Sequence, residues 1–280
     1  MKVLPFKIPK PEKTAIIYQE DIGICFYDKL HQHEEIQISL ILEGEGTLIV
    51  GDTANYYKKD DILVIGGNIP HVFKSNTETS TKSHMLSIFF KYSSFGDGFF
   101  MLEDLNELDV FFNKAKKGFK IITSKSEASK LFLKLHSASR IERLIILLQL
   151  LKISSKSDYQ TLSSFIYNKT YNEIEGKRMQ DVFEFTMSHY TEKITLDKIA
   201  NVANMTKNAF CKYFKKRTNK TYVRFLNELR IEHSCRLIYS DPELPLTEIA
   251  YRSGYNNISN FNKQFKAIKN QKPSAMKTFN

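Results

Sequence analysis

Two stretches of the sequence, LDKIANVANMTKNAFCKYFKK at residues 196–216 and LTEIAYRSGYNNISNFNKQFK at residues 246–266, follow one pattern. In each, Leu-x-x-Ile-Ala is followed by a short interruption and then by Phe-x-x-x-Phe-Lys. Apolar residues at these spacings predict a helix of about nine residues, a turn and a second helix of about twelve. Asn204 and Gly254 stand at equivalent positions of the two turns, and both residue types tolerate the left-handed backbone that such a turn requires. The repeat therefore predicts two helix-turn-helix units.

The second helix of each unit is expected to bury an aromatic face and to expose a polar one. The predicted core residues are Phe210, Tyr213, Phe214, Phe261, Phe265 and Ile268. The residues predicted to face outward and to bind DNA are Lys207, Asn208, Cys211, Lys212, Lys215, Lys216, Ser259, Asn260, Asn262, Lys263 and Lys266. Lys and Asn near a helix N-terminus suit base edges in a major groove, and later lysines suit phosphates. Thr206 is expected to cap the first of these helices.

The distribution of charge separates the chain into two parts. The 280 residues carry a formal net charge of +10, and residues 176–280, with 19 basic and 9 acidic side chains, hold all of it. Residues 1–175 hold 22 side chains of each sign. A solvated, lysine-rich surface would also be basic, but the repeated helix-turn-helix pattern lies in the same part of the chain. A polyanion such as double-stranded DNA is therefore the expected partner of the second part.

Composition excludes several classes of protein. With 42% hydrophobic residues, the chain can bury a core and is not wholly disordered. Cys25, Cys211 and Cys235 are too few and too far apart for a disulfide framework or a zinc site. No apolar run reaches the ~20 residues that cross a bilayer, and the N-terminus lacks the apolar stretch of a signal peptide. We therefore expect a cytoplasmic protein with no membrane partner. Without a P-loop, a nucleophile elbow or a metalloprotease motif, we expect no catalytic residues and no enzymatic activity.

The first part of the chain changes from strand-like to helical patterning near Tyr92. The predicted strands are residues 36–42, 47–50, 56–57, 62–65 and 85–90, which suggest a small antiparallel barrel or sandwich. Residues 102–112 and Ser139–Ile153 have helical periodicity. The second of these helices is apolar on all sides, so it is buried in a core or against another subunit, and we expect it to form a homodimer. The polar stretch at 154–177 is expected to hold a short helix at Leu162–Tyr167 and to end in the interdomain linker.

The last hundred residues resemble the DNA-binding domain of AraC-type transcription regulators. The motifs that carry this resemblance are the two repeated stretches, the connecting RIEHSCRLI at 230–238 and the closing KPSAM at 272–276. The resemblance implies two helix-turn-helix units on successive major grooves, joined by one long helix, here Tyr222–Ser240. Such a helix spans roughly 30 Å, close to the ~34 Å between successive groove segments on one face of DNA. Asn219 and Asn270 stand where the family usually has glycine, and Asn can take the same backbone conformation.

The N-terminal half resembles the cupin-like sensor domain that is common in that family. The matching motifs are His31-x-His33, residues 36–42, Gly44-Glu45-Gly46, Asp60-Asp61-Ile62-Leu63 and Ile69-Pro70-His71. Metal-dependent cupin enzymes use two histidines, a later Glu and a third histidine as ligands, and here Gln37 occupies the carboxylate position. Loss of the anionic ligand weakens a metal site. The resemblance thus implies an effector pocket at His31, His33, Gln37 and His71, with no metal and no other cofactor; a metal on the three histidines remains the alternative.

The predicted architecture is α+β with two domains. Residues 1–170 are expected to form a cupin-like β-barrel with trailing helices, which senses the effector and dimerises, and residues 176–280 an all-α domain of two helix-turn-helix units. The predicted function is a sequence-specific transcription regulator controlled by a small-molecule effector. Its expected partners are double-stranded DNA, the effector and a second copy of the chain, with RNA polymerase as a further candidate. The alternatives are a metal-dependent cupin enzyme with a DNA-binding appendage and an effector-independent DNA-binding dimer.

Overall fold

The computed structural model describes residues 14–77, 80–167 and 173–278. The chain divides into two units, Met1–Gly176 (the N-terminal unit) and Lys177–Asn280 (the C-terminal unit). Part of the predicted linker, residues 168–172, lies outside the described residues. Among the helices in the described ranges, none combines the length and the apolar character that crossing a membrane requires.

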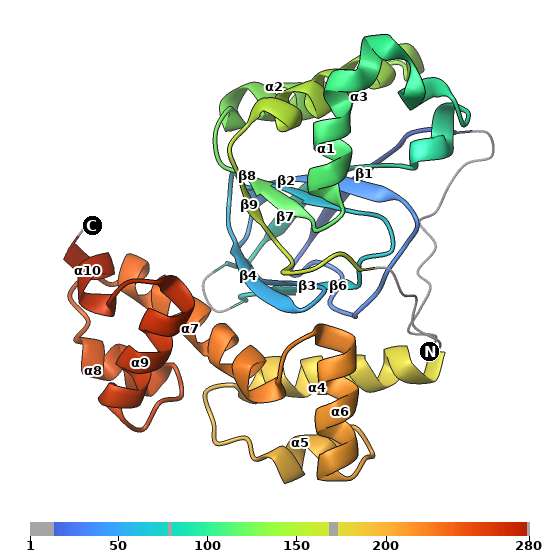
Figure 1. The fold of residues 1–280 in the computed structure, drawn as a ribbon. Helices are drawn as coiled ribbons and strands as arrows, with labels where there is room; N and C mark the ends of the chain where they lie inside the picture. The colour runs from blue at the N-terminus through green and yellow to red at the C-terminus, as the bar shows by residue number, and fades with distance from the viewer. Residues whose placement is uncertain (1–13, 78–79, 168–172, 279–280) are drawn as a thin grey trace. The chain divides into compact units, whose positions relative to one another are not determined.

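Two antiparallel sheets form the N-terminal unit (Figure 1). The strands are β1 (Ile17–Gly23), β2 (Ile36–Glu43), β3 (Gly46–Val50), β4 (Thr53–Tyr57), β5 (Ile62–Ile65), β6 (His71–Ser75), β7 (Ser83–Phe90), β8 (Phe119–Ile121) and β9 (Tyr159–Thr161). The larger sheet has the order β1-β7-β2-β5-β8-β9, and the smaller one has the order β4-β3-β6. The described strands thus confirm the β-rich N-terminal domain expected from the sequence; they form two antiparallel sheets, as in the sandwich alternative, and no closed barrel is seen among them.

Strand β2 is buried on both of its faces. Side chains alternate along a strand, so Ile38 and Leu40 point to one face and Gln37 and Ser39 to the other. The apolar face joins the main core of the unit. The polar face is buried as well, and the Ser39 hydroxyl lies 2.8 Å from that of Ser87 on β7. The interior of this unit therefore has an apolar side and a polar side.

Helices cover the apolar side of the larger sheet (Figure 1). They are the 3-10 helices η1 (Tyr92–Phe95), η2 (Phe99–Met101) and η3 (Glu103–Leu108), and the α-helices α1 (Asp109–Ala115), α2 (Lys125–Lys134) and α3 (Arg140–Lys156). The helix predicted over 102–112 is thus a 3-10 turn followed by α1, and Leu102 is exposed instead of lying on a buried face.

The predicted helix at Leu162–Tyr167 is absent, since these described residues have no helical structure. The buried carboxylate of Asp52 explains the difference. It accepts hydrogen bonds from the backbone N–H of Ser164 at 2.9 Å and from the Ser163 hydroxyl at 2.9 Å. The segment is thereby held in an irregular conformation, after the short strand β9 that the sequence pattern did not reveal.

The apolar residues of α3, all of which were expected to support a homodimer, are divided between the core and the surface. The side chain of Leu147 is fully buried and that of Leu150 is 1% exposed, so both belong to the core. The side chains of Ile141 and Ile145 are 63% and 50% exposed. One side of this helix thus packs into the core beside α1, α2 and η3, and apolar residues on its other side are exposed.

The C-terminal unit is all-helical and contains the predicted repeat. Its helices are α4 (Glu173–His189), α5 (Leu196–Val202), α6 (Lys207–Thr218), α7 (Tyr222–Ser240), α8 (Leu246–Arg252), α9 (Ile258–Lys269) and α10 (Pro273–Thr278). Helices α5 and α6 form the first helix-turn-helix, α8 and α9 form the second, and α7 joins them. Asn204 and Gly254 have φ angles of 52° and 85°, which confirms the left-handed turns expected from the sequence. Asn219 and Asn270 also adopt this conformation where α6 and α9 end.

Each helix-turn-helix has its own aromatic core. Phe210 and Phe214 of α6 pack with ring centroids 5.7 Å apart, and Phe261 and Phe265 of α9 pack with centroids 5.6 Å apart. All four side chains are fully buried. Tyr213, predicted as a core residue, is only half-buried.

We expect Phe214→Ala and Phe265→Ala each to lower the free energy of unfolding of residues 177–280 by about 3–5 kcal/mol, because each leaves a cavity in a closely packed core. Chemical denaturation followed by circular dichroism measures this loss. Lys216→Ala and Lys266→Ala, on the exposed faces of the same helices, are the matched controls and should change the free energy by less than about 0.5 kcal/mol. Equal effects of the core and surface changes would contradict the assignment of the two cores.

Candidate functional site

Helices α6 and α9 carry the residues predicted to bind DNA. The exposed side chains on α6 include Lys207, Asn208, Lys212, Lys215 and Lys216, and Cys211 is half-buried. Those on α9 include Ser259, Asn260, Asn262, Lys263 and Lys266. The two helices therefore present equivalent polar faces to solvent.

Both of these helices begin at a capping side chain. The Thr206 hydroxyl accepts a hydrogen bond from the N–H of Ala209 at 3.4 Å, which confirms the expected cap. Asn257, which the sequence analysis did not single out, accepts from the N–H groups of Ser259 and Asn260 at 2.8 and 3.2 Å. A cap fixes the first turn of a helix, and in a helix-turn-helix protein this turn meets the base edges.

Most lysines on these faces have no carboxylate partner. The ammonium group of Lys207 lies 3.4 Å from the Asp197 carboxylate, and because both side chains are exposed the pair contributes little to stability. Among the residues that the structure describes, Lys212, Lys216 and Lys263 take part in no ion pair. Their charges remain available to phosphate groups, which release counterions when they are neutralised.

Helix α7 connects the cores of the two helix-turn-helix units. Near its beginning, Tyr222 and Phe225 pack on the rings of α6. Near its end, Cys235 and Ile238 belong to the core formed with α8 and α9. Both cores thus contain part of one continuous helix.

Arg230, in the middle of α7, contacts the loop before the first helix-turn-helix unit and a ring of the second unit. Its Nε donates to the carbonyl oxygen of Tyr190 at 2.6 Å, and its Nη2 donates to that of Glu192 at 2.7 Å, just before the first unit. Its guanidinium lies 5.5 Å from the ring centroid of Tyr255 in the second unit. A Cβ atom at position 254 would lie 2.9 Å from Arg230 Nε. The close approach of Arg230 therefore requires glycine at this position, in addition to the positive φ angle. Sequence reasoning missed Arg230, because α7 carries several other charged residues and Arg230 does not stand out among them.

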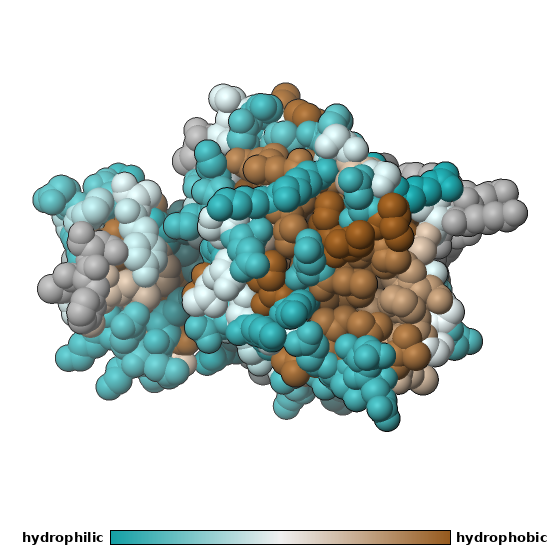
Figure 2. All heavy atoms as spheres, turned by 90° about the horizontal axis from the view of Figure 1, so that it is seen from above, coloured by the Kyte–Doolittle hydropathy of each residue, from teal (hydrophilic) through white to brown (hydrophobic). Residues whose placement is uncertain are grey.

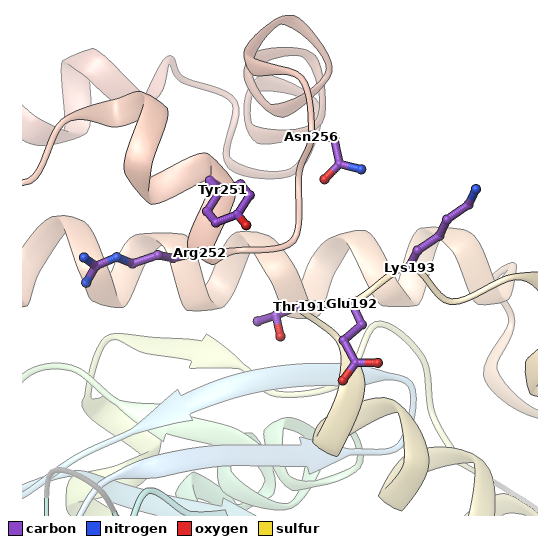
Figure 3. A pocket seen from close by; sticks show the side chains of 6 residues that line it. All are labelled: Thr191, Glu192, Lys193, Tyr251, Arg252 and Asn256. Carbon is purple, nitrogen blue, oxygen red and sulfur yellow. The ribbon is translucent and has the colours of Figure 1, made fainter.

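A polar pocket of about 480 Å³ lies beside this junction. Its lining residues are Thr191, Glu192, Lys193, Tyr251, Arg252 and Asn256 (Figure 3). They come from the loop before α5, the end of α8 and the turn before α9. The lining combines cationic, anionic and amide groups, so it selects no single ligand charge.

In the N-terminal unit, the structure brings the predicted pocket residues together. One ring nitrogen each of His31, His33 and His71 lies within 4.8 Å of the other two, and all three side chains are buried. His31 and His71 exchange backbone hydrogen bonds of 3.0 and 2.8 Å, which hold the loop before β2 against the start of β6. Gln37 on β2 completes the cluster, with its Oε1 atom 3.4 Å from His33 Nε2.

The protonation state of the three rings follows from their hydrogen bonds. Each Nδ1 contacts a backbone carbonyl oxygen: that of Lys29 at 2.8 Å, of Glu35 at 2.9 Å and of Ile69 at 2.8 Å. Because a carbonyl oxygen only accepts, each Nδ1 carries the proton and each Nε2 carries a lone pair. The cluster therefore offers three neutral imidazole acceptors.

Burial lowers the pKa of each of these histidines. It brings the pKa of His31 to about 4. The pKa of His33 is lowered by burial although the Glu35 carboxylate opposes the shift. Burial and the neighbouring rings of His31 and His33 hold the pKa of His71 well below its usual value. Neutral imidazoles can accept hydrogen bonds from a polar ligand or ligate a metal ion.

Comparison with known proteins assigns a domain to each part of the chain. Residues 199–278 match the family described as a helix-turn-helix domain, and residues 27–89 match the family described as a cupin domain. The chain is 27% identical over 263 residues to the uncharacterized HTH-type transcriptional regulator YdeC of Bacillus subtilis, which covers 91% of this chain and 87% of YdeC. It is 25% identical over 135 residues to the HTH-type transcriptional activator RhaS of Escherichia coli, covering 48% of this chain and 45% of RhaS.

Solved structures with some likeness include ToxT from Vibrio cholerae, with a TM-score of 0.38 and 15% identity over 94% of this chain and 97% of ToxT. The DNA-binding domain of AdpA, solved in complex with a target DNA, has a TM-score of 0.34 and 20% identity, covering 35% of this chain and 87% of that domain.

Proposed function

The chain is an AraC-type DNA-binding transcription regulator with an N-terminal cupin domain, and we propose that α6 and α9 read two successive major-groove segments while the N-terminal unit senses a small molecule. The observation that carries the groove proposal is the pair of equivalent exposed faces on α6 and α9. Helix α7, with 19 residues, is about 28 Å long. This length suits the ~34 Å between groove segments on one face of DNA.

Support for a sensing role comes from the buried polar side of the N-terminal unit. Gln37 donates from its amide nitrogen to the Ser39 hydroxyl at 2.9 Å, so the polar groups continue from the histidine cluster along β2. Buried polar groups cost free energy unless they are hydrogen-bonded, and a polar ligand can supply the missing bonds. We assign this unit binding without catalysis, as in relatives that are transcription regulators.

The exposed side of α3 supports a homodimer. Ile141 and Ile145 lie one helical turn apart and are both exposed. Figure 2 shows apolar residues gathered on a face of the molecule seen from above Figure 1, where α2 and α3 lie. Symmetric pairing of two copies buries such a surface. We further propose RNA polymerase as a partner, since RhaS is an activator, and the cytoplasm as the location, since a transcription regulator acts on DNA.

The DNA-binding proposal predicts a difference between the two units. Residues 177–280 alone should bind duplex DNA, and for about four phosphate contacts the affinity should fall about 100-fold between roughly 50 and 200 mM salt. Residues 1–176 should not bind DNA, because their charges balance. Fluorescence anisotropy over a salt series measures both. Binding by the N-terminal fragment, or affinity that does not respond to salt, would contradict the proposal.

The two recognition helices should act on different base pairs. Lys212→Ala should weaken binding and relax base preference in one half of the operator by about 1–3 kcal/mol, and Lys263→Ala should do so in the other half, about one turn of DNA away. Selection from randomised operators measures both effects. Lys130→Ala, an exposed lysine of α2 with the same charge change, is the control and should leave base preference unchanged. If the two variants alter the same positions, the two-groove arrangement is wrong.

The dimer proposal makes a prediction for α3. The double variant Ile141→Glu with Ile145→Glu should be monomeric and folded, because both side chains are exposed, as sedimentation and circular dichroism will show. Leu147→Glu should instead unfold the N-terminal unit, because it places a charge in the core. Ile24→Glu, at an exposed site outside the helices, should remain dimeric. A double variant that stays dimeric excludes this surface.

A further inference from the structure

We propose that Asp52 is a positioning residue for DNA binding. Its buried carboxylate holds residues 162–164, and so fixes the point at which the chain leaves the N-terminal unit on its way to the C-terminal unit. We call this carboxylate and residues 162–164 the clasp. The inference rests on the proposed function, in which a homodimer places two C-terminal units on DNA.

The Asp52 carboxylate accepts hydrogen bonds from two residues that lie 111 and 112 positions later in the chain. Its Oδ1 atom accepts from the Ser163 hydroxyl and from the backbone N–H of Ser164, each at 2.9 Å. Its Oδ2 atom accepts from the Ser164 hydroxyl. Hydrogen bonds to an ionised group are roughly twice as strong as those between neutral groups. The three bonds therefore hold both serines against the turn between β3 and β4.

Other contacts hold the same segment from two further elements. The Asn55 side chain on β4 donates to the carbonyl oxygen of Leu162 at 2.9 Å. The N–H of Leu162 donates to the carbonyl oxygen of Gly118, just before β8, at 3.0 Å. Residues 162–167 form no helix or strand, so side-chain bonds take the place of the backbone ladder that fixes a regular element. The position of the segment thus depends on the clasp.

Gly51 allows the segment to approach this turn closely. Its φ angle is 58°, and a Cβ atom there would lie 2.8 Å from the Ser163 Oγ atom. A larger residue at position 51 would push Ser163 away from the Asp52 carboxylate. The turn between β3 and β4 is therefore shaped to receive this distant segment of the chain.

The clasp precedes the boundary between the two units. Strand β9 ends at Thr161, and α4, which leads into the C-terminal unit, begins at Glu173. Five residues connect the buried Tyr167 to Glu173, and opening the segment back to Thr161 makes this connection eleven residues long. The effective concentration of a tethered unit at a second site falls roughly as the −3/2 power of the length, here about threefold. An open clasp therefore weakens simultaneous binding of two C-terminal units.

The clasp is also joined to the histidine cluster. Val50 on β3 pairs with His71 on β6, and the N–H of Gly51 donates to the carbonyl oxygen of Pro70 at 2.8 Å. Asp52 follows directly in the chain. A ligand that displaces His71 therefore displaces the turn that carries the carboxylate. Such a ligand shifts DNA binding to the extent that it binds better to the open or to the closed clasp.

Binding of the full-length chain to two duplexes tests the positioning role. One duplex carries a single operator selected from random DNA, and the other carries two copies, which the parent dimer should bind more tightly. Asp52→Ala should lower the affinity for the two-copy duplex about threefold and leave that for the single-copy duplex unchanged. Amide hydrogen exchange at residues 162–167 should become about tenfold faster, and exchange in β2 should not change. A merely structural role would not separate the two duplexes.

Ser164→Ala keeps the test decisive if Asp52→Ala fails to fold, because it removes one hydrogen bond of an exposed residue. It should act in the same direction, and Ser164→Thr, which keeps the hydroxyl, should restore the parent behaviour. Ser93→Ala, at another exposed serine of the N-terminal unit, is the matched control and should bind both duplexes as the parent does.

A double-mutant cycle tests the link to the histidine cluster. His71→Ala should speed exchange at residues 162–167 in the parent but add nothing in Asp52→Ala. Additive effects of the two changes would overturn this link.

Two results would overturn the positioning role, and they differ in what they say of the proposed function. If the parent prefers the two-copy duplex and the clasp variants bind both duplexes as the parent does, the positioning role is wrong and the regulator function stands. If the parent shows no preference for the two-copy duplex, the homodimer is contradicted, and the positioning role with it.

Discussion

The rigid helix α7 fixes the relation between the two recognition helices, and the DNA-binding geometry depends on it. Its first half is buried among the rings of α4 and α6, and its second half completes the core of α8 and α9. Arg230 lies between these halves and ties the loop before α5 to Tyr255. Loss of hydration lowers the pKa of Arg230, yet the two carbonyl oxygens and the ring compensate the buried guanidinium. Because both cores include part of α7, a movement of one core moves α7 and the other core with it. This favours a fixed spacing between α6 and α9 on DNA.

The N-terminal unit follows a different principle, because its larger sheet separates an apolar interior from a polar one. Helices α1, α2 and α3 cover the apolar face. On the other face, the histidine cluster, Gln37, Ser39 and Ser87 form a continuous set of buried polar groups. Buried polar groups are stable only when they have hydrogen-bond partners, and Gln37, Ser39 and Ser87 partner one another here. The helical face therefore packs the core, and the polar face is the part of the unit to which the sensing role is proposed.

The sequence predicts local features of this protein better than it predicts long-range ones. The repeated motifs predicted the two helix-turn-helix units, because apolar periodicity and capping residues act over a few positions, and the family resemblance predicted α7 with its observed bounds. Strands β1, β6, β8 and β9 were not predicted. Strands β8 and β9 have only three residues each and are defined by their partners in the sheet. The contact of Asp52 with Ser163 and Ser164 joins distant parts of the chain, and the short helix expected there does not form. For the same reason, the sequence named His31, His33 and His71 but could not show that their acceptor atoms converge.

A change in operator spacing tests the central claim most directly. Binding is measured for an operator selected from random DNA and for the same operator with about five base pairs, half a helical turn, inserted between its two half-sites. If α7 holds the recognition helices at a fixed separation, the insertion will reduce the affinity of residues 177–280 to that of DNA with a single half-site. Equal affinity for both operators would show that the two helix-turn-helix units move independently, and would contradict the account.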